Sequence, residues 1–194
     1  NYGPLDTDIR HNFQATSIFE LPFGRNKRWA SDGVGNAILG GWQFNSLLSM
    51  RGGTPTRASA GAGTLNSNGN SQFADCVGPV TTLGTPDLWW SPSGLADPNV
   101  VSPNTPRFGT CGMNTLYGPG LINVDLGLFR KFQVGENVDV QFRAEAFNIS
   151  NTPHFSTPSA NISSSNFGVV GGVQNTGREG IDQRVFRLGL RIGW

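Results

Sequence analysis

The stretch FRLGLRIGW, residues 186–194, alternates strictly between two kinds of side chain. Its even positions are large and apolar: Phe186, Leu188, Leu190, Ile192 and Trp194. Its odd positions are Arg187, Gly189, Arg191 and Gly193. Successive side chains of a β-strand point to opposite faces, so the stretch predicts a strand with one wholly apolar face. A soluble sheet edge with such a row invites aggregation, so either a second protein layer or lipid must cover it.

Four upstream segments alternate in the same way, and they cover residues 11–21, 42–51, 123–129 and 138–147. The short, glycine-containing link 133–137 predicts that the last two of these segments pair as an antiparallel hairpin. Strands of about ten residues have the length that a tilted strand needs to cross a bilayer. The sequence therefore predicts an all-β fold, an antiparallel transmembrane β-barrel segment of about five strands in an open, curved sheet.

The links between these strands alternate in length. Two are long and rich in Gly, Ser, Asn and Thr, at about 52–120 and 149–181. Bacterial barrels have short periplasmic turns and long extracellular loops, so we expect both long links to be extracellular. The same parity makes 22–41 periplasmic, although it is long for such a turn. It is basic, with Arg25, Lys27 and Arg28, and can hold a short helix, but its role stays open.

Composition narrows the function. Charged residues make up 14% of the chain and the net charge is +1, so no basic excess indicates a nucleic-acid partner. No apolar run is long enough for a membrane helix. The chain opens on Asn1 rather than Met, and we expect it to be the C-terminal part of a longer barrel, placed in the bacterial outer membrane. We find no catalytic, cofactor-binding or metal motif and expect no enzyme. Cys76 and Cys111 either form a disulfide or remain two isolated thiols.

Six charged residues share the polar side of the expected strands and should face the barrel lumen: Asp125, Asp139, Arg143, Glu145, Arg187 and Arg191. They form either ion pairs that stiffen the wall or part of a substrate pathway, and the first interpretation is preferred because one strip of wall cannot define a binding site. Asp125 and Arg143 should lie within cross-strand or diagonal reach. The loop aromatics contact a ligand, pack the loops together or join an aromatic girdle; they are Trp89, Trp90, Phe108 and Tyr117.

Several motifs in combination resemble one known family. They are DIRHNF at 8–13, FELPFG at 19–24, GGWQ at 40–43, RGGTP at 51–55, RAEAFN at 143–148, NTPHF at 151–155 and the stretch from 184 to 194. In this combination the chain resembles the C-terminal barrel of TonB-dependent receptors of the acidobacterial Oar-like type. The similarity covers nearly the whole chain except about 58–104.

The resemblance implies a barrel of about 22 strands with an N-terminal plug and a carboxypeptidase-regulatory-like domain. The partners it implies are outer-membrane lipid, the plug, the TonB complex through regions upstream of Asn1, and the barrel-assembly machinery, which would read the apolar row of the last strand. The implied function is energised uptake of a scarce nutrient. Two alternatives remain: a non-transporting structural or adhesive barrel, and a soluble β-sandwich enzyme or lectin in which a second sheet covers the apolar row.

Overall fold

The computed structural model describes residues 3–29, 32–65, 71–174 and 183–194. The chain forms two compact units. The first, here called the wall sheet, consists of residues 13–50, 122–153 and 175–194. The second, called the loop unit, consists of residues 1–12, 51–121 and 154–174.

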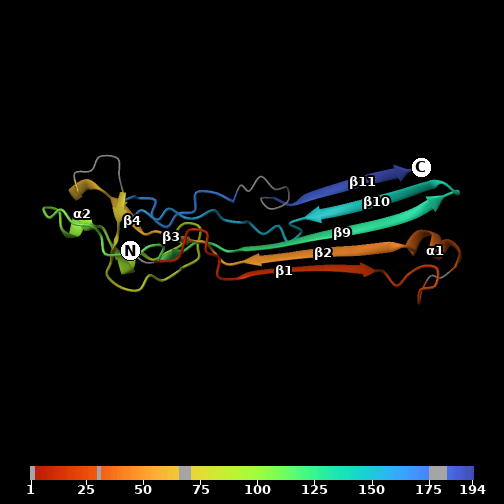
Figure 1. Cartoon of the computed structure of the whole chain (residues 1–194), viewed down its shortest axis with the longest axis horizontal. Helices are drawn as coiled ribbons and strands as arrows, with labels where there is room; N and C mark the ends of the chain where they lie inside the picture. The colour runs from red at the N-terminus through yellow and green to blue at the C-terminus, as the bar shows by residue number, and fades with distance from the viewer. Residues whose placement is uncertain (1–2, 30–31, 66–70, 175–182) are drawn as a thin grey trace. The chain divides into compact units, whose positions relative to one another are not determined.

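The wall sheet holds five strands in the order β1-β2-β9-β10-β11, which lie side by side in Figure 1. Their bounds are Asn12–Glu20 for β1, Trp42–Arg51 for β2, Leu121–Val134 for β9, Val138–Phe147 for β10 and Val185–Gly193 for β11. Strand β10 pairs antiparallel with both β9 and β11. Among the described residues, β1 and β11 have no strand on their outer sides. The predicted open, antiparallel, all-β sheet is confirmed.

Strand β9 is longer than the alternation predicted. The expected strand ended at Phe129, whereas β9 continues to Val134, which pairs with Val138. The connection is therefore only residues 135–137, and Gly135 adopts a φ of 72°, which favours glycine. The pattern broke down at Arg130, a charged residue in the otherwise apolar row of even positions.

The link between β1 and β2 contains a short helix, α1, at Gly33–Leu39. Before it, the chain turns back on itself, because the backbone N–H of Gly24 donates to the carbonyl oxygen of Trp29 at 2.9 Å. None of the helices formed by the described residues is long and apolar enough to cross a membrane.

The loop unit is built from short elements around its own core. Three two-stranded sheets pair β3 (Pro55–Thr56) with β8 (Leu116–Tyr117), β4 (Ser59–Gly61) with β5 (Ser71–Phe73), and β6 (Asp75–Cys76) with β7 (Leu95–Ala96). Two 3-10 turns, Gly63–Leu65 and Pro92–Gly94, and the helix α2, Pro98–Val101, complete it.

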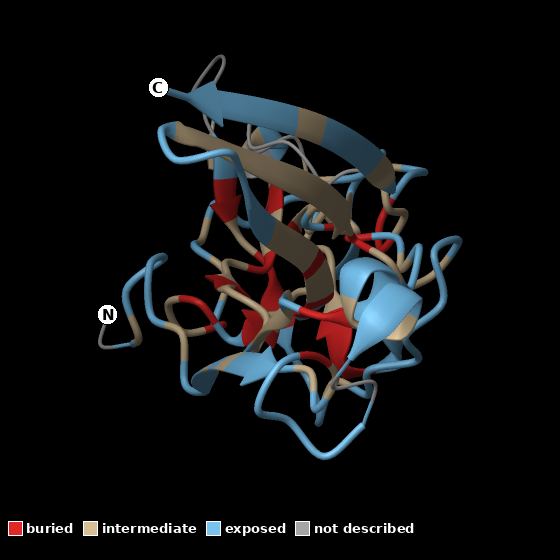
Figure 2. Cartoon of the chain, turned by 90° about the vertical axis from the view of Figure 1, so that its right-hand side faces the viewer, coloured by how far each residue is buried: buried red, intermediate tan, exposed pale blue. Residues whose placement is uncertain are grey.

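The core of the loop unit is small and apolar, and buried segments appear red in Figure 2. Its buried members are Ala58, Ala74, Trp90, Leu95, Cys111, Leu116 and Phe167. The described parts of the two long links are thus folded around a core rather than structureless. Residues 66–70 of the first link and 175–181 of the second lie outside the described residues.

Candidate functional site

One face of the wall sheet is apolar and uncovered. The β10–β11 register sets Phe186, Leu188, Leu190 and Ile192 opposite Ala146, Ala144, Phe142 and Val140. The four β11 side chains are 52% to 74% exposed, and Trp194 is 95% exposed. In Figure 2 the strand that ends at the C-terminus is mostly pale blue. This exposure contradicts the soluble β-sandwich alternative, which required a second sheet over this row.

The apolar face is not flat. Small side chains on β10, Ala144 and Ala146, lie between larger ones on the neighbouring strands. They leave an open depression of about 320 Å³, whose larger apolar walls are Phe44, Leu126, Leu128, Phe186 and Leu188. Toward the turn end of the sheet, the rings of Trp42 and Phe142 meet edge to face, with their centroids 6.0 Å apart. Such a continuous apolar surface favours hydrocarbon over water as its neighbour.

The opposite face carries the six charged residues singled out from the sequence. The register sets Glu145 opposite Arg187 and Gln141 opposite Arg191, and Asp139 and Arg143 lie on the same side of β10. Asp125 lies on the same side of β9, because residues of equal parity share a face across this register. The structure therefore brings all six to one face. That this face lines a lumen stays a prediction.

Local contacts fix several of these polar side chains. The Lys131 Nζ lies 2.8 Å from the Asp139 Oδ2. Arg143 donates from its Nη2 to the Gln141 Oε1 at 2.9 Å, and its guanidinium lies 5.7 Å from the centre of the Phe129 ring. These contacts run along or between neighbouring strands, as expected for groups that stiffen a wall.

The expected proximity of Asp125 and Arg143 is wrong. Arg143 pairs with Phe129, four residues from Asp125, which is about 13 Å along a strand. The Asp125 Oδ1 instead accepts from the Asn123 Nδ2 at 2.8 Å and from the backbone N–H of Asn148 at 2.9 Å. The error arose because the connection was expected to cover 133–137, whereas β9 continues to Val134. The longer strand shifts the pairing by two residues, so that Arg143 lies opposite Phe129. The same shortening hid Lys131, which the sequence reasoning missed.

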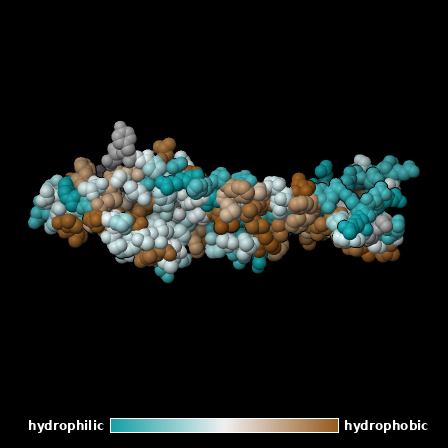
Figure 3. All heavy atoms as spheres, turned by 90° about the horizontal axis from the view of Figure 1, so that it is seen from below, coloured by the Kyte–Doolittle hydropathy of each residue, from teal (hydrophilic) through white to brown (hydrophobic). Residues whose placement is uncertain are grey.

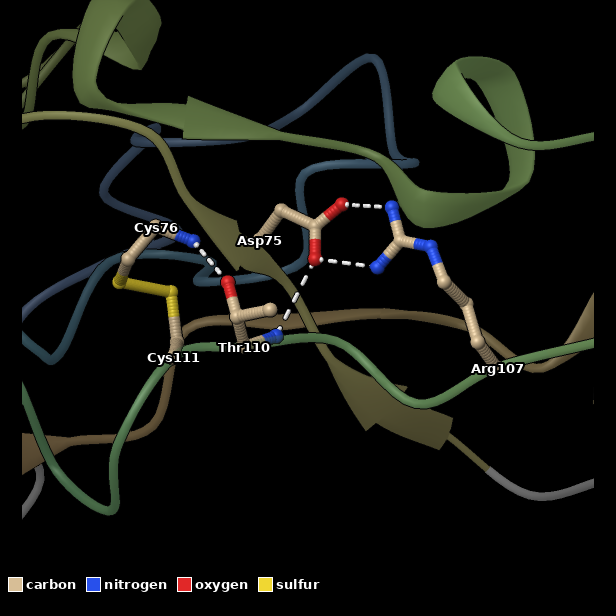
Figure 4. The surroundings of a disulfide bond; sticks show 5 residues. All are labelled: Asp75, Cys76, Arg107, Thr110 and Cys111. Atoms are coloured by element: carbon tan, nitrogen blue, oxygen red, sulfur yellow. Dashed lines mark hydrogen bonds and ion pairs between the residues drawn. A yellow bond between two sulfur atoms is a disulfide. The ribbon is translucent and has the colours of Figure 1, made fainter.

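In the loop unit, Cys76 and Cys111 form a disulfide, with a Cα–Cα distance of 4.8 Å and a sequence separation of 35 residues (Figure 4). Beside it, the nearly buried Asp75 carboxylate receives two hydrogen bonds from Arg107, at 2.8 and 2.5 Å. The backbone N–H of Thr110 donates to the Asp75 Oδ1 at 3.1 Å, and the Thr110 Oγ1 accepts from the backbone N–H of Cys76 at 3.1 Å. The covalent link and the ion pair thus hold the same two segments together.

These bonds fix the charge state of Asp75. The hydrogen bonds from the Arg107 guanidinium lower the pKa of Asp75, and the Thr110 N–H acts in the same direction, against the opposing effect of burial. Asp75 is therefore ionised at neutral pH. Sequence reasoning missed this pair because Asp75 and Arg107 are 32 residues apart, with no motif linking them.

The loop aromatics divide between packing and exposure. Trp90 is 1% exposed and donates from its Nε1 to the carbonyl oxygen of Tyr117 at 2.9 Å. The Trp89 Nε1 donates to the same oxygen at 3.3 Å, and its ring meets Phe155 edge to face. Both tryptophans pack the loops together. Phe108, in contrast, is 72% exposed.

The loop unit also contains a wide depression of about 960 Å³, which polar and apolar residues line together. Its polar lining residues are Thr7, Thr54, Thr56, Thr157, Arg57, Asp6 and Asn114, and its apolar ones include Pro4, Leu5, Pro55 and Met113. The buried Asn114 donates from its Nδ2 to the carbonyl oxygen of Pro4 at 2.7 Å and to the Asp6 Oδ1 at 2.6 Å. A depression lined by a few polar residues among apolar ones suits a small solute. No cluster of three or more metal-ligating side chains occurs within the described ranges.

A family model described as an outer membrane beta barrel domain matches residues 1–184. The match covers β1, β2, β9, β10 and the loop unit, and it ends one residue before β11 begins. No curated protein and no solved structure matches the chain.

Proposed function

Because the chain belongs to the family of outer membrane beta barrel domains and resides in the bacterial outer membrane, we propose that it forms the C-terminal part of the wall of a TonB-dependent receptor that takes up a nutrient. In this role its residues are not catalytic. They form wall and surface loops around a pathway whose energy comes from the TonB complex.

The two-faced wall sheet is the observation that carries this proposal. The apolar face of β10 and β11 is exposed and suits lipid, whereas the opposite face holds the charged set from Asp125 to Arg191. A sheet edge cannot be left unpaired in hydrocarbon, because its backbone N–H and C=O groups would lose their hydrogen bonds. Within the described part of the chain, the outer edges of β1 and β11 lack a strand partner, so they call for further strands. A wide barrel with a polar interior can hold a plug. We further expect the barrel-assembly machinery to recognise the apolar row of β11.

The loop unit supports the uptake role from the outside. On the proposed topology its two long links face the medium, and the depression near Asn114 is available to a small solute. The Oar-like resemblance points in the same direction, since it spans the strands and the parts of the loop unit outside about 58–104.

Two experiments on the complete protein test the proposal. Its full reading frame should encode a plug and a TonB-contacting segment ahead of these residues. A deletion strain should show the same growth defect on limiting nutrients as a strain that lacks TonB, and combining the two deletions should add nothing. If the deletion lowers growth further in a strain that already lacks TonB, or if the reading frame encodes no plug, the transport role is refuted.

A second candidate function, a non-transporting adhesive barrel, is favoured by one observation. The loop unit has its own core and covalent link, and Phe108 on its surface is 72% exposed. Adhesion predicts that Phe108→Ser reduces attachment of cells to a surface while nutrient-limited growth stays normal. Transport predicts that Phe108→Ser leaves nutrient-limited growth and attachment unchanged, whereas variants of the depression, such as Thr56→Val, reduce nutrient-limited growth.

A further inference from the structure

The link between β1 and β2 contains a tight turn and a short helix. This turn segment, residues 22–29 and 32–41, folds back at Gly24 and later forms α1. The backbone N–H of Arg25 donates to the Asn36 Oδ1 at 2.8 Å, which ties the first half of the segment to the helix. A Cβ added at Gly24 would lie 2.7 Å from the Cα of Gly40, so the two backbones are in close contact. The turn segment therefore has a defined structure and a defined outward surface.

Two side chains hold α1 on the apolar side of the wall sheet. Trp42 donates from its Nε1 to the carbonyl oxygen of Ile38 at 3.0 Å. Arg130 donates from its Nη1 to the same oxygen at 3.0 Å, and from its Nη2 to the carbonyl oxygen of Ala37. Arg130 pairs with Phe142, whose ring Trp42 contacts, so both donors belong to the apolar face. A cation at the final carbonyl groups also suits the negative end of the helix.

The helix presents apolar side chains to its surroundings. Val34 and Ile38, four residues apart and thus on one helical face, are 74% and 59% exposed, and Leu39 is 47% exposed. Trp29, from the preceding loop, is 51% exposed. An exposed apolar helix face that continues from a lipid-facing sheet matches a helix lying in the boundary between headgroups and acyl chains.

The same segment carries an excess of positive charge. Among residues 22–41 there are three basic residues, Arg25, Lys27 and Arg28, and one acidic residue, Asp32. Lys27 binds Glu20 at 2.7 Å, whereas the Arg28 guanidinium lies over the ring of the exposed Trp29 at 5.5 Å. Figure 3 shows hydrophilic and hydrophobic atoms next to each other at the end of the wall sheet that carries α1. Basic side chains close to a membrane surface attract anionic lipid headgroups.

We propose that the turn segment is a membrane-interface anchor that binds anionic phospholipid. Val34, Ile38 and Leu39 enter the headgroup boundary, and Arg25 and Arg28 bind the phosphate groups. Arg130 and Trp42 hold the helix so that its apolar residues point to lipid instead of the barrel interior. This inference rests on the outer-membrane location and not on transport.

The depth of the helix can be measured on the complete protein in vesicles. A spin label at Ile38→Cys should be more accessible to oxygen than to a water-soluble nickel chelate. A label at Glu136→Cys, in the exposed β9–β10 turn at the same end of the sheet, is the matched control and should show the opposite preference. Cys76 and Cys111 are bonded to each other and take no label. Equal chelate accessibility at both sites overturns the proposal, and so does protection of position 38 from both reagents, which would indicate a protein partner.

The lipid preference is tested by quenching a bimane fluorophore on the same Ile38→Cys site. Spin-labelled phosphatidylglycerol should quench it at lower concentration than spin-labelled phosphatidylcholine. Replacing Arg25 or Arg28 with Gln should lower this preference by about fivefold for each arginine. The charge-neutral double variant Glu20→Gln/Lys27→Gln is the control and should leave the preference unchanged. Equal quenching by the two lipids in the unmodified segment overturns the phospholipid assignment, even where the transport tests succeed.

Discussion

Replacing Leu188 with Arg tests which face of the wall sheet meets lipid. Leu188 lies next to the middle residue of β11, Gly189, and is 74% exposed on the apolar face. At about 3.3 Å per residue and a tilt of about 40°, the nine residues of β11 span about 23 Å, close to the height of a barrel's apolar band. Position 188 then lies near the bilayer midplane. An arginine there should destabilise the folded protein by about 2–4 kcal/mol.

Asn45→Arg is the matched control on the polar face. Asn45 lies beside Gly127, since a Cβ added at Gly127 would be 3.7 Å from the Asn45 Cβ, and Gly127 pairs with Glu145. An arginine at position 45 can therefore extend toward a carboxylate at nearly the same depth as Leu188. We expect it to change the free energy of unfolding by less than about 1 kcal/mol.

The assay is reversible unfolding of the complete protein in lipid vesicles with urea, followed by the loss of the heat-modifiable folded band on gels. The result that refutes the reasoning is an Asn45→Arg variant at least as destabilised as Leu188→Arg. That outcome would mean that the polar face meets lipid or that neither face does.

Three further predictions concern the loop unit. Cys76→Ser removes the disulfide between residues 35 positions apart. The unfolded chain then has more conformational freedom, which should destabilise the loop unit by about 4 kcal/mol. Faster proteolysis of the loops on intact cells measures this loss. Arg107 lowers the pKa of Asp75 in the folded state, so the stability that this pair contributes is present above about pH 4 and is lost as the pH falls through the folded pKa. The thermal midpoint of the loop unit should therefore drop on acidification in the parent protein. In the Asp75→Asn variant it should hardly change. Gly109→Ala places a Cβ 1.9 Å from the carbonyl oxygen of Phe73 and should destabilise by about 1–3 kcal/mol, whereas Gly171→Ala, with open space around it, should be neutral in the same proteolysis assay.

The wall sheet was predictable because its information is local. In β10 and β11 the identity of each residue indicates which face of the sheet it occupies. The short connection 135–137 makes β9 and β10 an antiparallel hairpin, although the exact register depends on where β9 ends. The alternation fails as a guide where a residue on the apolar face is polar because it binds another part of the protein. Arg130 binds the end of α1, a partner more than ninety residues away, so the alternation appeared to stop.

The loop unit could not be derived in the same way. Its core uses small residues such as Ala58 and Ala74, which carry no alternation signal. Its polar contacts join distant parts of the chain, as when Arg51 donates to Gln174 at 2.5 Å, or Asp75 binds Arg107. Such pairs depend on how loops close in space, and the entropy and packing of that closure are not visible in a residue pattern. The disulfide was one of two open alternatives for the same reason.

The double pairing of β10 sets where this chain can change its length in evolution. Residues from Asp139 to Ala146 each face a partner on β9 and another on β11. Losing one residue there would turn every following side chain to the other face, placing Glu145 toward lipid and Ala144 toward the polar side. Insertions and deletions among natural variants are therefore expected between β2 and β9, or between β10 and β11. The connections can then vary in length and sequence while the strand lengths stay constant.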